Sequence, residues 1–255
     1  MAALPFRRTR LVMSALVIGC IVPDTPYFLF LIAHGFQGHT LLGIFDFDLP
    51  VGLAELWLYH AFIRQPLTLF LPVGVRQRLG DDGGRFSFLP PARFAMIVLS
   101  LLIGIATHLV WDSFCHRSMW PYRHWEFLRI HVLLPFAGDL AVYKLLQYAS
   151  SVFGLVVIAI WIWQWYRNTK PSRPLPADPL SAKQKRILAV VWSVLAIAAG
   201  IVRAHFKAGS FPRHLRPFVL FSAYATVTVI AVLLVGLLTI GIYLRRRAAP
   251  HLQPQ

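Results

Sequence analysis

The chain has 255 residues, of which 57% are hydrophobic and only 14% are charged, and its mean hydropathy is +0.62. These values exclude a water-soluble domain of this size, because such domains carry about 25% charged residues. The net charge of +15 does not indicate a nucleic-acid partner, since the basic residues lie between apolar segments, where membrane topology and anionic lipid headgroups account for them.

Six apolar stretches follow one another, each long enough to cross a hydrocarbon core of about 30 Å as a helix. We expect an all-α, polytopic integral membrane protein, because a helix satisfies its own backbone polar groups in lipid. The predicted segments are residues 11 to 33, 41 to 63, 92 to 114, 149 to 166, 186 to 206 and 218 to 244. They form a single transmembrane domain over residues 1 to 255. The basic, proline-rich linker at residues 168 to 178 is expected to be flexible.

Basic residues are divided unequally between the two sides of the predicted membrane domain. Alternate connections carry 17 Lys and Arg on the side of the two termini and 8 on the other side. The positive-inside rule therefore predicts that both termini are cytoplasmic, in a multi-pass protein of the cell's plasma (inner) membrane. Membrane lipids are the expected partners, and no nucleic acid is expected.

Ionisable residues in and beside the apolar segments gather at one membrane face. Asp24 lies between Pro23 and Pro26 toward the end of the first segment, and His39 follows in the first loop. Asp112 lies in the last turns of the third segment. The first and third segments run in the same direction, so these groups are expected to meet at the outer face. Such residues are costly at membrane depth and persist where they have partners, which indicates a functional site.

The third segment carries a stripe of possible metal ligands. His108, Asp112 and His116 are spaced four residues apart and share one helix face, but the ends of the triplet are separated by about 12 Å of rise. All three cannot bind one ion unless the helix ends before His116. His108 and Asp112 are the natural ligand pair, and Asp24 and His39 are the best candidates to complete a site for a divalent metal, with zinc expected. For His108 alone, a histidine held by a neighbouring helix is the alternative.

A second acidic pair opens the next segment. Asp46 and Asp48 are two residues apart, so on a regular helix they point to different sides. At most one of them is expected to contribute a ligand or to orient one.

Three stretches resemble the DUF4184 family of bacterial membrane proteins: residues 14 to 28 with Val-Pro-Asp-Thr-Pro-Tyr, residues 39 to 50 with His-Thr-Leu-Leu-Gly, and residues 107 to 116 with Thr-His-Leu-Val-Trp-Asp. They are more distantly similar to the DUF457 group, labelled membrane-bound metal-dependent hydrolases. The resemblance covers roughly residues 1 to 165. It implies metal ligands at the Pro-Asp aspartate, the His-Thr histidine and the His-x-x-x-Asp pair. In this chain these are Asp24, His39, His108 and Asp112.

The amino terminus departs from this resemblance. Members begin with a Pro-Phe-Thr-x-Ser-His-x-Ala-Ala-like stretch, whereas this chain opens Met-Ala-Ala-Leu-Pro-Phe-Arg-Arg without that histidine. We interpret this as a start that lies upstream or as a degenerate member.

The leading hypothesis is a metal-dependent hydrolase whose site lies at the outer membrane interface. Asp112 and His116 are its expected catalytic residues, and a lipid-linked ester or phosphoester is the expected substrate class. One alternative is a proton- or metal-coupled transporter that uses the same groups. The other is a non-catalytic membrane scaffold with a decayed site.

Overall fold

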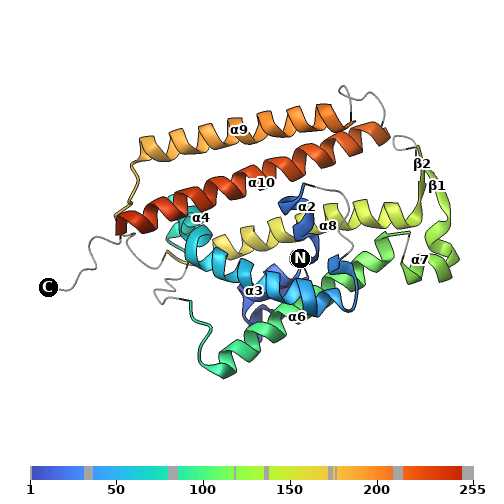
Figure 1. Ribbon diagram of the computed structural model, residues 1–255, viewed down its shortest axis with the longest axis horizontal. Helices are drawn as coiled ribbons and strands as arrows, with labels where there is room; N and C mark the ends of the chain where they lie inside the picture. The colour runs from blue at the N-terminus through green and yellow to red at the C-terminus, as the bar shows by residue number, and fades with distance from the viewer. Residues whose placement is uncertain are drawn as a thin grey trace. The chain divides into compact units, whose positions relative to one another are not determined.

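The computed structural model describes residues 2–31, 37–79, 86–117, 119–134, 138–171, 175, 177–208 and 215–248. Its regular structure is helical apart from one small β-hairpin (Figure 1). Contacts divide the chain into two compact units. The first unit comprises Met1–Asp24, Phe36–Leu53 and Ser87–Thr169, and the second comprises Thr25–Gly35, Ala54–Phe86 and Lys170–Gln255. That the whole chain is one domain stays a prediction.

Four helices in the described residues are long and apolar enough to cross a membrane. They are Pro91–His124, in which the long helix α6 covers Pro91–Cys115, then α8 (Val142–Asn168), α9 (Ala182–Ala208), and Phe218–Arg247 of α10 (Leu215–Ala248). The predicted all-α class therefore fits the structure apart from the small hairpin, and a membrane protein is plausible from these four helices, whereas the count of six spans stays a prediction.

The first predicted segment is built from short pieces. It contains α1 (Met13–Gly19), the 3-10 turn η2 (Val22–Asp24) and α2 (Thr25–Leu29). Pro23 and Pro26 account for the interruption, because a proline removes a backbone donor and clashes with the preceding helical turn.

The second predicted segment is helical but irregular. Its elements are η4 (Ile44–Asp48), α3 (Leu49–Leu58) and η5 (Tyr59–Ile63), followed by α4 (Arg64–Leu69). Both η4 and η5 are π turns, which occur mostly as single turns within helices and often near functional sites. A shorter helix, α5 (Val73–Arg76), comes next.

In the first unit, α1 and α6 meet backbone to backbone at two glycines. A Cβ atom added to Gly19 would lie 2.3 Å from the carbonyl oxygen of Leu101, and one added to Gly104 would lie 2.4 Å from that of Leu16. Leu16 and Leu101 are themselves fully buried. Small residues thus let the two helices approach closely, as at interfaces between membrane helices.

The connection between α6 and α8 is structured. It holds α7 (Trp120–His124), the 3-10 turn η6 (Glu126–Arg129) and the antiparallel strands β1 (His131–Leu134) and β2 (Gly138–Ala141).

Helix α8 buries little of its surface within the chain: only 6% of its apolar stretch is buried. Within the described residues, the surface of α8 is therefore left for lipid or another partner.

In the second unit, α9 and α10 lie side by side (Figure 1). Arg203 of α9 donates hydrogen bonds to the carbonyl oxygen of Tyr224 at 3.2 Å and to Oγ1 of Thr228 at 3.1 Å, and also to the carbonyl oxygen of Leu31. Its guanidinium lies 5.0 Å from the Tyr224 ring centroid. A cation within the helix pair is thus satisfied by neutral acceptors and an aromatic face.

Of the predicted flexible linker, residues 172–174 and 176 lie outside the described residues. At its end, Asp178 is held by two cations: Nη2 of Arg76 lies 2.5 Å from Oδ1, and Nζ of Lys185 lies 2.6 Å from Oδ2. These hydrogen bonds lower the pKa of Asp178 to about 2, because they stabilise its charged form.

Candidate metal centre

Asp24 is the last residue of η2, directly after the buried residues Val22 and Pro23. The turn forms because α1 ends at Gly19 and Pro23 cannot continue an α-helical hydrogen-bond pattern. The Asp24 side chain remains 41% exposed, so a solute could reach the carboxylate.

His39 is presented by the short turn η3 (Gln37–His39). A Cβ atom added to the neighbouring Gly38 would lie 2.6 Å from Oδ1 of Asp48 and 3.0 Å from Cα of Pro23. The absence of a side chain at Gly38 therefore lets this turn pack directly on the backbone that carries Asp24.

His108 lies on α6, and its two ring nitrogens have different surroundings. Nδ1 lies 2.9 Å from the carbonyl oxygen of Cys20, so it can only act as the donor in that hydrogen bond. Nε2 is buried and has no hydrogen-bond partner among the described residues. In the neutral ring, the lone pair then belongs to Nε2. A backbone carbonyl that fixes the tautomer in this way is a common partner of metal-binding histidines.

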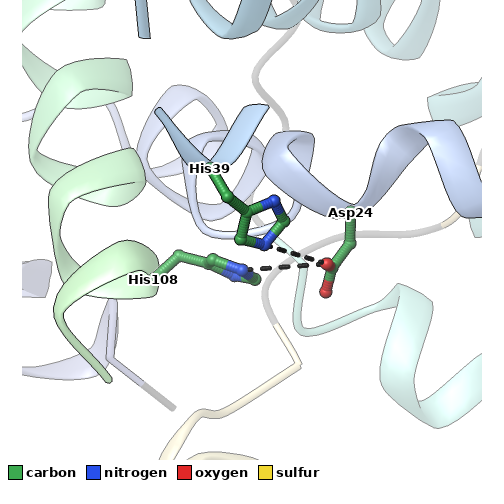
Figure 2. A group of neighbouring side chains, drawn as sticks. All are labelled: Asp24, His39 and His108. Atoms are coloured by element: carbon green, nitrogen blue, oxygen red, sulfur yellow. Dashed lines mark ion pairs between the residues drawn. The ribbon is translucent and has the colours of Figure 1, made fainter. Parts of the chain in front are cut away.

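Asp24, His39 and His108 converge from three separate elements (Figure 2). Their ligand atoms all lie within 4.8 Å of one another. Oδ1 of Asp24 is 3.7 Å from Nε2 of His39 and 3.8 Å from Nε2 of His108. Tetrahedral zinc at about 2.0–2.1 Å from its ligands requires ligand atoms about 3.4 Å apart. The two distances from Asp24 are only slightly longer than this value, so the carboxylate and each imidazole fit a zinc-sized ion.

Asp112 links this triad to His116. Its Oδ2 lies 3.5 Å from Nε2 of His39, while its Oδ1 lies 3.0 Å from Nδ1 of His116. Helix α6 ends at Cys115, and the His116 backbone is extended, with φ −125° and ψ 136°. The helix thus ends before His116, so His116 does not continue the helix face that carries His108 and Asp112. His116 still pairs with Asp112 and does not join the group of three.

The four predicted ligands and the predicted base are therefore neighbours, with Asp24, His39 and His108 as the tightest group. Of the second acidic pair, Asp48 is fully buried and lies against the turn at Gly38, whereas Asp46 is exposed. Asp48 thus adjoins the backbone next to His39, although it is not part of the ligand triad.

Two supporting groups escaped the sequence reasoning. The Cys20 carbonyl gives no signal in the sequence, because any residue has one. Gly38 stands directly before His39, and a glycine beside a possible ligand was a signal that could have been used. The roles of the Cys20 carbonyl and of Gly38 become visible only in the folded chain, where the first contacts His108 and the second contacts Pro23.

A family model described as "Domain of unknown function (DUF4184)" matches residues 1–242. No curated protein and no solved structure matches the chain. The matched range contains every residue of the candidate centre and also α9.

Proposed function

The chain belongs to the DUF4184 family, and we propose that it is a membrane enzyme that uses a divalent metal, zinc by preference, to hydrolyse an ester or phosphoester. The single observation that carries this proposal is the convergence of Asp24, His39 and His108 with a buried Nε2 that lacks a hydrogen bond. A neutral imidazole held in one tautomer and aimed at a carboxylate is suited to a cation.

Asp24, His39 and His108 would hold the metal, and Oδ2 of Asp112, 3.5 Å from Nε2 of His39, is the candidate for a fourth ligand. Imidazole nitrogen and carboxylate oxygen are ligands that zinc accepts. When bound, such an ion lowers the pKa of a coordinated water to about 7 and so supplies a nucleophile at neutral pH.

His116 is the proposed general base. Its Nδ1 can donate to Oδ1 of Asp112, which leaves Nε2 free to accept a proton. Its side chain is 41% exposed, so both water and substrate can reach it. In this arrangement Asp112 orients the base, in the way that a carboxylate orients a catalytic histidine.

The surroundings favour an anionic substrate at the membrane interface. Arg117 follows His116 directly, and its Nε donates to Oη of Tyr143 at 2.6 Å. Lys144 comes next along α8, so two cations lie near the Asp112–His116 pair and could stabilise a phosphoryl group. We propose the outer interface of a bacterial inner membrane as the location, with both termini cytoplasmic, on the distribution of basic residues.

Transport is the second candidate, because Asp24 lies where the first predicted segment is interrupted. Broken helices often form ion sites in transporters. The prolines and the short elements α1 and η2 support this candidate. A metal-loaded protein without hydrolytic activity that moves zinc into proteoliposomes would favour it over hydrolysis.

The first test is metal content after purification in detergent. Wild-type protein is expected to retain about one equivalent of zinc, whereas His108→Ala should lose most of it. His131→Ala is the matched control, since His131 also faces an aspartate, with Nδ1 2.9 Å from Oδ2 of Asp139, but lies on the hairpin. Comparable folding is checked by circular dichroism and size-exclusion chromatography.

Two outcomes would refute the metal proposal. One is wild-type protein that takes up no metal even after supplementation. The other is an equal loss of metal in His108→Ala and His131→Ala. If zinc is retained as expected, lipid esters and phosphoesters are screened with wild-type protein and with His108→Ala.

A further inference from the structure

A groove of about 570 Å³ lies in the first unit, and its lining residues do not include the candidate metal ligands. One wall is the amino-terminal stretch around η1 (Leu4–Arg8), and the other is one face of α8. The residues that matter for its chemistry are Arg7, Arg8, Phe153, Val157, Ile160 and Trp161.

The α8 wall is apolar and faces outward. Phe153 is 58% exposed and Ile160 is 48% exposed, on a helix that buries little of its surface within the chain. In a bilayer, hydrocarbon chains are the natural filling for an apolar groove on such a helix. Trp161 adds an amphipathic ring of the kind that is enriched at headgroup level.

The other wall supplies positive charge. Arg7 and Arg8 are both exposed, and no carboxylate of the described residues forms an ion pair with either of them. Two unneutralised guanidinium groups beside an apolar groove complement a phosphate joined to acyl chains. Arginine binds phosphate through paired N–H donors, and basic pockets beside membrane helices bind anionic lipid headgroups.

We propose that this groove is a binding site for one anionic phospholipid. The phosphate lies at Arg7 and Arg8, and an acyl chain runs along Phe153, Val157 and Ile160. The lipid thereby fastens the amino-terminal stretch to α8. This proposal is independent of the metal centre and of any hydrolytic activity.

The test is native mass spectrometry of the purified full chain with equal amounts of phosphatidylglycerol and phosphatidylcholine. Wild-type protein is expected to retain phosphatidylglycerol in preference. A double variant, Arg7→Gln with Arg8→Gln, should reduce the bound phosphatidylglycerol roughly 30-fold, the factor expected when two cations near a lipid phosphate are removed. Val157→Trp should reduce it as well, by filling the groove without changing charge.

Two matched controls distinguish specific binding of the lipid in the groove from unspecific electrostatic attraction of anionic lipid to the protein. Arg246→Gln with Arg247→Gln removes the same charge from the end of α10, and Ile162→Trp places the same tryptophan at an exposed α8 position that does not line the groove. Both should retain the lipid. Excess inorganic phosphate should leave it bound, since phosphate has no acyl chains.

Three results would overturn the proposal. The first is equal lipid loss in the Arg246, Arg247 control, which would mean unspecific charge attraction. The second is displacement of the lipid by inorganic phosphate. The third is a two-chain assembly that is lost in Val157→Trp whether or not lipid is present, which would make a second copy the occupant of the groove.

Discussion

Nδ1 of His108 lies 2.9 Å from the carbonyl oxygen of Cys20, and this hydrogen bond joins α6 to the residue that follows α1. The acceptor is a main-chain atom, so its position depends on how closely the two helices approach. Gly19 and Gly104 permit that approach. The state of the imidazole is therefore controlled by helix packing.

Substitution of Gly104 by alanine is predicted to weaken zinc binding. The added Cβ would lie 2.4 Å from the carbonyl oxygen of Leu16 and 2.8 Å from the backbone nitrogen of Cys20, so α1 and α6 must separate. Disturbing the partner of a metal-binding histidine costs about 10- to 100-fold in affinity. Chelator competition with purified protein measures the change.

Gly52→Ala is the control for this experiment. The three atoms nearest to its added Cβ all belong to the side chain of Leu101, the first at 3.0 Å, and a side chain can move more easily than a backbone. Unchanged zinc affinity in Gly104→Ala would contradict the role given to helix packing.

Replacing His116 by glutamine is predicted to separate metal binding from catalysis. His116 does not belong to the triad of ligand atoms, so zinc content should remain near the wild-type value. Hydrolysis of a responsive ester should fall by about 10²- to 10⁴-fold, the usual contribution of a general base. The zinc content and the hydrolysis rate of wild type and His116→Gln are measured in parallel. A rate within a few-fold of wild type would rule out His116 as the base.

Replacing Arg203 by methionine is predicted to destabilise the α9–α10 pair. The substitution removes the two hydrogen bonds that Arg203 donates to the Tyr224 carbonyl and to Oγ1 of Thr228. Hydrogen bonds between membrane helices contribute about 0.6–1.7 kcal/mol each, so the Tm should fall by roughly 4 °C. Arg186→Met, at an exposed position of the same helix, should change the Tm in detergent little. Equal shifts in the two variants would contradict the anchoring role.

The Asp178 ion pairs should make a small contribution to stability that depends on pH. The pKa of this carboxyl is lowered to about 2, from an ordinary value of 3.8. A lowered pKa in the folded chain means that the contribution is fully present above pH 3.8 and is lost as the pH falls through about 2. Because the side chain is 30% exposed, we expect about 0.5–1 kcal/mol, or roughly 2 °C in Tm.

The measurement compares wild type with Asp178→Asn in thermal unfolding from pH 6 to pH 2. The difference in Tm should shrink toward zero at the acidic end. A difference that is independent of pH would show that charge is not its source.

The sequence predicts the helical membrane class well, because long apolar runs leave little choice in lipid. It also predicts which residues approach one another at the candidate centre, since Asp24, His39 and Asp112 are polar groups next to apolar segments that end at the same predicted face. The interruption at Pro23 follows from proline chemistry.

Other features depend on tertiary structure and could not be read from composition. The irregular π turns around α3 and the small hairpin before α8 have no strong local signal. The sequence around Arg203 gives no indication of its partners. Its role depends on acceptors from Tyr224, Thr228 and Leu31, which are distant in sequence.

The backbone contact between α1 and α6 has a consequence for the protein in its native surroundings. No side-chain rotation at Gly19 or Gly104 can absorb a change in helix spacing. Any force that spreads the two helices must therefore lengthen the hydrogen bond from His108 to Cys20. The lipids around the protein change their packing with acyl-chain length and membrane curvature, so a bilayer that moves α1 and α6 apart should weaken this hydrogen bond and, with it, the proposed binding of a metal ion.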